Sequence, residues 1–258
     1  MIKQGDEVDL IKLKREKDIN AMEKASKVVG ETLEMSREYM QPGITTWDID
    51  KKIEEFIRNK GAIPSFKGYQ GFPASACISV NEVLIHGIPS KNRYLEEGDI
   101  VTIDVGAYLG GFHGDAARTY PVGKISEERK KLLETTYQAL EIGIETLKKA
   151  SRLGEMGYEI QKFVENRGYS VIRDFGGHGI GREMHEDPFV PNFGEKNSGP
   201  KIRTGMTLAI EPMISMGEYA TMILEDGWTV INVDHSLNAH FEDDIAITQD
   251  GIKILSRV

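Results

Sequence analysis

A chain of 258 residues is long enough for one large domain or two small ones. Its 41 acidic and 32 basic residues give a formal net charge of −9, which argues against DNA or an anionic membrane as a partner. A single cysteine, Cys77, excludes an intrachain disulfide, and the charged N-terminus lacks the apolar stretch of a secretory signal, so we expect a cytoplasmic protein.

Four segments have apolar residues at helical spacing, and most of the remaining chain has strand character. The predicted helices cover residues 16–40, 46–61, 126–150 and 155–167. The apolar side of the third helix is predicted to consist of Leu133, Tyr137, Leu140, Ile144 and Leu147. The basic run Lys12–Lys17 also contains Glu16, and mixed charge of this kind is typical of a solvated helix face.

The two halves of the chain resemble each other at an offset of 107 residues. The matching pairs are Ile53 and Ile160, Phe56 and Phe163, Ile57 and Val164, Gly61 and Gly168, Gly98 and Gly205, and Asp104 and Glu211. A single match arises easily by chance, but six at one offset favour two related α/β halves around a pseudo-twofold axis. Because there is no low-complexity linker, we predict one domain, residues 1–258, with a short N-terminal extension of about residues 1–16.

The stretch "DIVTIDVGAYLGGFHGDAARTY" is typical of a β-hairpin, and each of its strands carries an acid, Asp104 and Asp115. A turn at Leu109-Gly110 would place these two carboxylates directly opposite each other. Because side chains alternate between the two faces of a strand, Asp104 would point away from the core. The core-facing residues of its strand would be Val101, Ile103 and Val105.

The same alternation turns Glu211 toward the shared side, together with one face of the last strand, His240, Glu242 and Asp244. Taken singly, each acid is more often a surface residue, but these acids lie within apolar strands. Like charges about 4 Å apart repel by roughly 4 kcal/mol at an effective dielectric near 20, and two divalent cations would cancel four carboxylates. The sequence thus predicts a dinuclear metal site.

Three of the six histidines are candidates for this site. His178 in "GGHGIG" has glycine neighbours, which let the backbone approach a metal or a substrate closely. His185 follows in "MHEDP", and His86 follows a strand in "LIHGIP". The other three lack a comparable setting and are interpreted as surface or core residues: His113, His235 and His240.

The motifs "NEVLIHGIP", "IDVGAYLGGFHGD", "GGHGIGREMHEDP", "AIEPM" and "FED", in this order, resemble the type I methionine aminopeptidase family. The resemblance covers about residues 17–256 and implies an α+β pita-bread fold, in which two pseudo-twofold related halves pack as one catalytic domain around a dinuclear metal site. The short interval between His178 and Glu211 leaves no room for the insert of the type II class. Asp243 departs from the histidine usual in type I members, and strand alternation predicts that it faces away from the metals.

The resemblance also implies which residues bind metal and perform the reaction. The ligands of two divalent ions (Co, Mn, Fe or Zn) would be Asp104, Asp115, His178, Glu211 and Glu242, with Asp115 and Glu242 as bridges. A metal-bridging hydroxide would attack the first peptide bond, and Glu211 would transfer its proton. His185 would contact the scissile amide and the developing oxyanion, and His86 would contact the reacting nitrogen.

Substrate and cation sites follow from the same resemblance. The methionine pocket would be formed by Tyr69, Phe72, Cys77, His86, Met184, His185 and Trp228. Asn81, Val83 and Asn238 match positions that hold a monovalent cation in relatives. The expected substrates are peptides and nascent chains with an N-terminal methionine and a small second residue, which the protein would meet as a monomer in transient association with the ribosome.

Two alternatives remain open. Prolidases and aminopeptidase P enzymes share the metal ligands, but they usually carry an additional N-terminal domain, and the segment before Asp104 is short for that. A non-enzymatic binding module on the same fold is the second alternative. Such modules have typically lost ligands, whereas all five ligand positions are intact here, together with His86 and His185.

Overall fold

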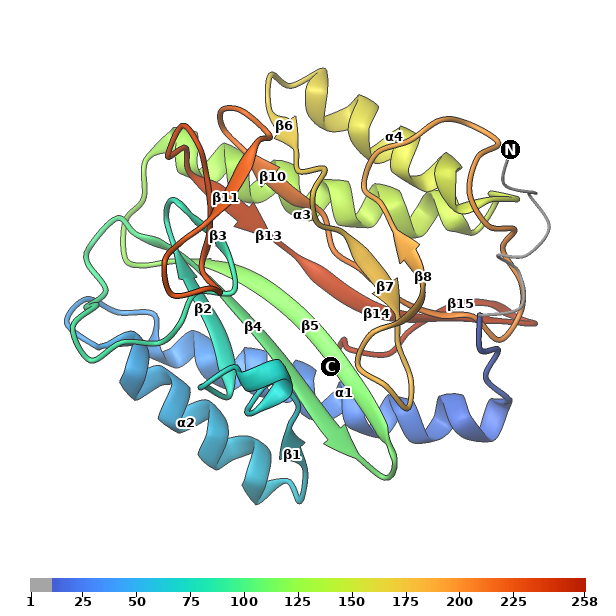
Figure 1. Cartoon of the computed structure of the whole chain (residues 1–258), viewed down its shortest axis with the longest axis horizontal. Coiled ribbons are helices and arrows are strands. Elements are labelled where there is room, and N and C mark those ends of the chain that lie inside the picture. The colour runs from blue at the N-terminus through green and yellow to red at the C-terminus, as the bar shows by residue number, and fades with distance from the viewer. Residues whose placement is uncertain (1–10) are drawn as a thin grey trace.

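The computed structural model describes residues 11–258, so most of the expected N-terminal extension lies outside the described residues. In the described part, the α-helices lie close to their predicted positions (Figure 1): α1 (Glu16–Ser36), α2 (Thr46–Asn59), α3 (Glu127–Leu147) and α4 (Leu153–Glu165). Two of them begin at capping hydroxyls, because Thr45 Oγ1 accepts from Asp48 N at 3.0 Å and Ser126 Oγ accepts from Arg129 N at 3.3 Å.

The buried side of α3 differs from the prediction in its first half. Leu132 and Thr136 are buried, whereas Tyr137 is 42% exposed and only its ring edge packs, 5.7 Å from the ring of Phe241. Thr136 avoids an unsatisfied hydroxyl by donating to the carbonyl of Leu132 at 2.8 Å. Thr136 therefore occupies the core position that the apolar pattern predicts for Tyr137.

Within residues 11–258, the strands form one nine-stranded sheet and two small three-stranded sheets. The main path runs in the order β1 (Ile63–Pro64), β4 (Ile100–Leu109), β5 (Phe112–Pro121), β14 (Glu242–Thr248), β9 (Thr207–Ile210), β7 (Gly177–Gly179) and β8 (Glu186–Val190), with β2 (Ala76–Val80) paired to β4 and β15 (Gly251–Ile254) to β14. The small sheets are β13 (Asn238–His240), β10 (Met213–Ser215) and β6 (Ser170–Val171), and β11 (Thr221–Ile223), β12 (Val230–Asn232) and β3 (Val83–Ile85).

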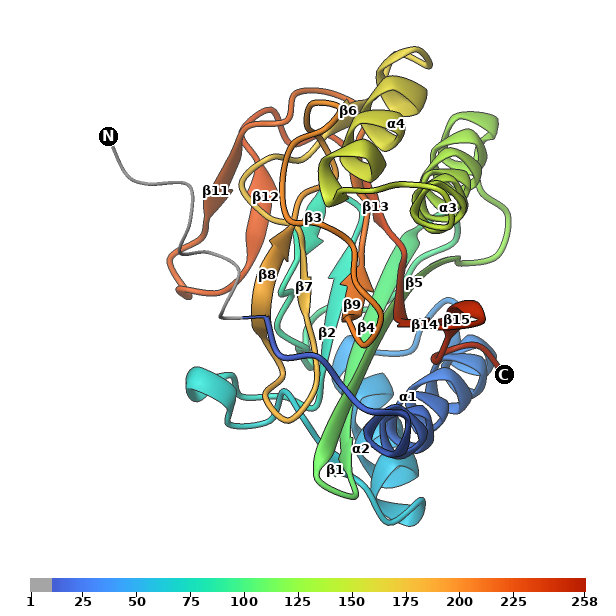
Figure 2. The ribbon, with the colours of Figure 1, turned by 90° about the vertical axis from the view of Figure 1, so that its right-hand side faces the viewer.

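The helices cover the strands in two pairs. α1 and α2 pack on β4, β5 and β2, while α3 and α4 pack on β13, β10 and β6. Figure 2 shows both pairs on one side of the strands and the β11–β12–β3 sheet on the other. Each pair buries its own apolar core, and the face of the strands that the helices leave free is where polar side chains can gather.

The predicted repeat has matching conformations in its two halves. Ile53 and Ile160 are both fully buried in their helices. Gly61 and Gly168, which follow these helices, have φ values of 74° and 79°. The glycines before β4 and β9 match as closely, with φ values of 95° at Gly98 and 93° at Gly205. Side-chain burial and left-handed glycines therefore recur at the offset read from the sequence.

The hairpin of β4 and β5 forms as predicted, but its register is shifted by two residues. Leu109 pairs with Phe112, so the turn lies at Gly110-Gly111, where φ is 63° and 88°. Two consecutive residues with positive φ make the two-residue turn whose twist matches a hairpin. Asp115 consequently pairs with Gly106, and Asp104 with Ala117. Because the shift is even, both acids keep the predicted face, as diagonal neighbours.

The basic run Lys12–Lys17 is solvated as predicted except at one residue. Its residues are exposed apart from Lys14, but only Glu16 and Lys17 belong to a helix. Lys14 places its side chain against Glu186 with only 7% of that side chain exposed, because charge pattern alone carries no information about a partner far away in the chain. No helix among residues 11–258 has the length and apolar character required to cross a membrane.

Candidate metal centre and substrate cavity

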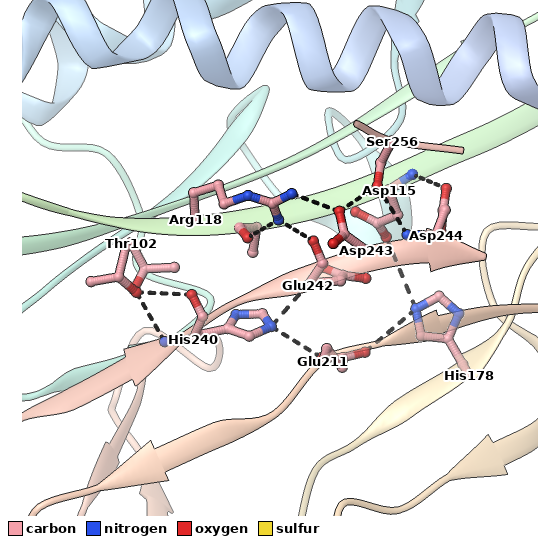
Figure 3. A network of polar contacts seen from close by, with 12 residues as sticks. Thr102, Asp115, Arg118, His178, Glu211, His240, Glu242, Asp243, Asp244 and Ser256 are labelled. Atoms are coloured by element: carbon pink, nitrogen blue, oxygen red, sulfur yellow. Dashed lines mark hydrogen bonds and ion pairs between the residues drawn. The ribbon is translucent and has the colours of Figure 1, made fainter. Parts of the chain in front are cut away.

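The five predicted ligands are brought together on the free face of the main sheet. They come from β4, β5, β7, the residue after β9, and β14: Asp104, Asp115, His178, Glu211 and Glu242. His178 Nε2 lies 3.9 Å from Asp115 Oδ2 and 3.7 Å from Glu211 Oε1 (Figure 3). Ligand atoms of Asp115, His178 and Glu242 all lie within 4.8 Å of one another, which is close enough to share one ion.

Electrostatics of the cluster fit a divalent cation. Burial, together with repulsion from Glu211, raises the pKa of Asp104 from its ordinary value of 3.8 to about 7. Burial and the neighbouring acids also raise the pKa values of Asp115 and Glu242 well above their ordinary range. Asp104 Oδ1, Asp115 Oδ1 and Glu242 Oε1 are buried without a hydrogen-bond partner. Oxygen atoms of this kind are the ligands that hard divalent cations require, so the residues present fit such a metal.

His240 is a site residue that the sequence interpretation missed. The side chain is buried, and its Nε2 lies 3.5 Å from Glu211 Oε2 and 4.0 Å from Glu242 Oε2 (Figure 3). Neither ring nitrogen has a hydrogen-bond partner. The signal was available, because strand alternation puts His240 on the same face as Glu242, but the absence of flanking glycines led to its interpretation as an ordinary histidine.

Asp243 faces away from the cluster, in agreement with strand alternation. Its carboxylate accepts hydrogen bonds from Arg118 Nη2 at 2.6 Å and Ser256 Oγ at 2.6 Å (Figure 3), and from Arg257 Nε at 2.8 Å. These partners lie on β5 and in the C-terminal segment, so the acid serves an ionic network behind the strand. Its presence in place of histidine leaves the five predicted ligands where they are.

Asp244 does not point into the shared cavity as alternation predicts. Its Oδ2 accepts from Ser26 Oγ at 2.9 Å and from the backbone N–H of Asp115 at 2.7 Å. Burial raises its pKa to about 8 despite these two hydrogen bonds. The hydrogen bonds to Ser26 of α1 and to the backbone of β5 hold this side chain away from the cavity.

The cluster forms one wall of a cavity of about 210 Å³. The seven residues predicted for the methionine pocket all line this cavity: Tyr69, Phe72, Cys77, His86, Met184, His185 and Trp228. Phe66 and Gln70 also line it and were not predicted. Phe72 and Trp228 meet edge to face with ring centroids 5.1 Å apart, so part of the cavity lining is aromatic and apolar.

The two auxiliary histidines flank the acids. His185 Nδ1 lies 2.8 Å from Tyr69 Oη, and its ring lies 4.3 Å from that of His178. Desolvation in the cleft lowers the pKa of His185 to about 4, and it lowers that of His86 as well. Both imidazoles are therefore neutral at neutral pH, and each can donate or accept one hydrogen bond.

A second cavity of about 500 Å³ continues outward from the first. It shares His86, His178, His185 and Glu211 with the inner cavity. Its outer part is lined by Phe175 and by Phe189, whose side chain is exposed. A ligand that fills the inner cavity can thus extend past the histidines toward solvent in one direction.

The residues predicted for a monovalent cation lie near each other. Asn238 N donates to the carbonyl of Asn81 at 3.0 Å, and Val83 is the first residue of β3, two positions further on. The side chain of Asn81 is engaged elsewhere, since its Nδ2 donates to Asp99 Oδ1 at 2.7 Å. Asn238 Oδ1 is buried without a hydrogen-bond partner among residues 11–258, so it is an oxygen that this corner can offer to a cation.

Comparisons with known proteins agree with this geometry. A family model described as metallopeptidase family M24 matches residues 20–249. The chain is 53% identical to a methionine aminopeptidase of Clostridium perfringens, over 96% of this chain and 100% of that relative. It is 48% identical to methionine aminopeptidase 1 of Bacillus subtilis, again over 96% and 100% of the two chains.

Solved structures confirm the expected pita-bread fold. A methionine aminopeptidase of Thermotoga maritima superposes with a TM-score of 0.94 at 46% identity, covering 96% of this chain and 100% of that one. A prolidase of Pyrococcus furiosus shares the fold at 24% identity and a TM-score of 0.78, but this chain covers only 66% of it. The chain therefore belongs to metallopeptidase family M24 and, within it, groups with the methionine aminopeptidases.

Proposed function

We propose that this chain hydrolyses the first peptide bond of peptides and nascent proteins that begin with methionine, with a preference for a small second residue. The observation that carries the proposal is the meeting of a five-residue acid and histidine cluster with an aromatic pocket in one cavity. An inner cavity that shares lining residues with a second cavity suits an exopeptidase, because one side chain can fill the first and the rest of the substrate can extend into the second.

Two divalent ions are proposed for the cluster. Asp115 and Glu242 would bridge them, Asp104 would hold one, and His178 with Glu211 would hold the other. Support comes from the separation of the ligand atoms and from buried oxygens that have no other partner. When bound, divalent ions supply a water of lowered pKa and polarise the carbonyl of the first peptide bond.

Glu211 is the proposed proton carrier. Burial alone would raise its pKa, but the 3.5 Å contact with His240 and the nearby His178 outweigh burial and lower it. A carboxylate that is ionised at neutral pH can accept a proton from the attacking water and give it to the departing amine. His185 and His86 are neutral donors beside it, suited to the developing oxyanion and to the reacting nitrogen.

The methionine side chain would occupy the aromatic end of the cavity. Burying such a side chain is worth about 1.5–3 kcal/mol, so the pocket selects moderately by area and rejects branched side chains by shape. The buried and adaptable Met184 beside Phe72 suits a flexible thioether ligand. The sulfur of the substrate would meet the edges of aromatic rings, a favourable contact in protein interiors.

Several further properties belong to this proposal. The protein would act in the cytoplasm as a monomer with one catalytic domain, in transient association with the ribosome, where N-terminal methionines emerge. Co, Mn, Fe or Zn would serve as the divalent metal. A monovalent cation would bind at Asn81, Val83 and Asn238.

Peptide hydrolysis tests the proposal directly. Met-Ala-Ser should be cleaved, Met-Leu-Ser much more slowly, and an X-Pro peptide not at all. Chelation and dialysis should abolish turnover, and titration with Mn, Fe, Co or Zn should restore it at two ions per chain. Preferential cleavage of X-Pro would assign the chain to the prolidase-like activity instead, and turnover that persists without metal would exclude the mechanism.

A further inference from the structure

An ion pair joins the N-terminal segment to the loop that carries two of the cavity residues. Lys14 Nζ contacts Glu186 Oε2, although the two residues are separated by 172 positions in the chain. Only 7% of the Lys14 side chain and 2% of the Glu186 side chain are exposed. A pair of this kind forms only where the surrounding backbone holds both partners in place.

Glu186 organises its own loop, residues 181–186. Its Oε1 accepts from the backbone N–H groups of Arg182 at 3.0 Å and Glu183 at 3.3 Å. Gly181 closes the loop by donating to the carbonyl of Glu183 at 3.0 Å. One oxygen of the Glu186 carboxylate thus accepts hydrogen bonds from the first backbone N–H groups of the loop. The other oxygen contacts Lys14.

Lys14 fits into space that two glycines leave. A Cβ at Gly181 would lie 2.5 Å from Lys14 Cε, and a Cβ at Gly205 would lie 2.8 Å from Lys14 O. The backbone N–H of Lys14 donates to the carbonyl of Gly205 at 2.7 Å, and Nζ donates to the carbonyl of Lys12 at 2.9 Å. The backbone of Lys14 is therefore held by Gly205, which precedes Met206 and β9. Its side chain is held by the loop of residues 181–186.

The loop held in this way carries Met184 and His185. Met184 is buried in the apolar cluster with Phe72 and Cys77, and His185 lies against Tyr69. Between them they face the proposed methionine side chain and the scissile bond. We propose that Lys14 is a positioning residue, which places Met184 and His185 through Glu186, so that the segment before α1 is part of the working active site. This inference rests on the proposed function.

Two predictions separate this role from a purely structural ion pair. Removing one partner leaves the other buried charge unpaired. This lowers the free energy of unfolding whether the pair positions the loop or is purely structural. Only a positioning role changes the catalytic constants of the folded protein, since a displacement of about 1 Å can cost roughly 100-fold in rate. The metal cluster lies on strands outside the loop, so metal content should remain at the parent level.

The experiment compares four variants with the parent protein: Lys14→Met, Glu186→Gln, the double variant and Lys14→Arg. Lys12→Met is the matched control. Lys12 lies in the same segment and is exposed. With Met-Ala-Ser well below the melting temperature, kcat/KM of Lys14→Met should fall by about 10- to 100-fold at unchanged metal content. The double variant should be no worse than Lys14→Met, Lys14→Arg should recover part of the loss, and Lys12→Met should equal the parent.

A second measurement does not depend on activity. In protein labelled with ¹³C at the methionine methyl groups, the signal of Met184, assigned through Met184→Leu, should shift or broaden in Lys14→Met and stay in place in Lys12→Met. A lower melting temperature with unchanged kcat, KM and Met184 signal would overturn the positioning role. A parent protein that fails to cleave Met-Ala-Ser, with the Met184 signal still responding, would overturn the proposed function alone.

Discussion

His240 Nε2 lies 3.5 Å from Glu211 Oε2, and this contact links the proposed proton carrier to the strand that supplies Glu242. The imidazole is 1% exposed, and neither of its nitrogens has a hydrogen-bond partner among residues 11–258. A buried polar ring without partners is costly, so its position is justified only if it serves the groups around it. The contact indicates that His240 helps to orient Glu211, one of the proposed ligands, as residues behind metal ligands commonly do.

Replacing His240 should therefore weaken metal binding. His240→Leu removes the donor at similar volume, and the affinity for Mn or Co, measured by isothermal titration calorimetry, should fall by about 10- to 100-fold. His240→Gln, which restores an N–H donor, should recover part of the loss. The exposed His235 provides the control, and His235→Asn should bind metal as the parent does. Equal affinity in His240→Leu and the parent would contradict the supporting role.

His178→Ala should remove most of the activity by eliminating the only nitrogen among the five proposed ligands. We expect kcat/KM for Met-Ala-Ser to fall by at least about 100-fold, with less than two metal ions retained per chain by mass spectrometry. The exposed His235→Ala is the matched control. Parent rates with normal metal content in His178→Ala would show that this ligand is assigned wrongly.

Metal-free protein should lose stability as the pH rises from about 4 to about 7. The pKa of Asp104 is raised from 3.8 to about 7 in the folded chain, mainly by burial. The folded state therefore binds the proton more tightly than the unfolded state, and stability falls wherever the unfolded state has already released it. Melting temperatures of metal-free protein at pH 5 and pH 8 measure this decline.

Asp104→Asn isolates the contribution of that carboxyl group. Because asparagine does not titrate, the variant should show a smaller decline in melting temperature between pH 5 and pH 8 than the parent, both without metal. Asp115 and Glu242 still titrate in the variant, so part of the decline should remain. Identical pH profiles for the two proteins would mean that Asp104 is not buried in the way described.

Asp243→Asn should destabilise the fold without emptying the metal site. The variant leaves Arg118 and Arg257 without their shared carboxylate, and breaking a buried ion pair costs about 3 kcal/mol. Chemical denaturation should record this loss of unfolding free energy, while metal affinity stays within about twofold of the parent. Normal stability combined with weaker metal binding would place Asp243 on the metal side of its strand instead.

Local sequence features determined most of the fold, whereas the residues of the candidate site were named largely through the family resemblance. Helical periodicity located α1 to α4, and the alternation of side chains along β4 placed Val101, Ile103 and Val105 in the core. Both signals depend only on neighbouring residues, which is why they can be read before the chain is folded. The offset of 107 residues between the two halves can be read from the sequence for the same reason, because each half has its own local pattern of apolar residues and glycines.

Contacts between distant segments decided the rest. The hairpin register followed the turn that forms at Gly110-Gly111, and contacts with Ser26 of α1 and the backbone of Asp115 hold Asp244 away from the shared cavity. The burial of Lys14 depends on Glu186, and no residue near Lys14 in the sequence indicates this distant partner. Sequence by itself specified which residues take part and which face of each strand they share. Only the tertiary structure determined their distances, because twist, strand breaks and long-range pairing are properties of the packed chain.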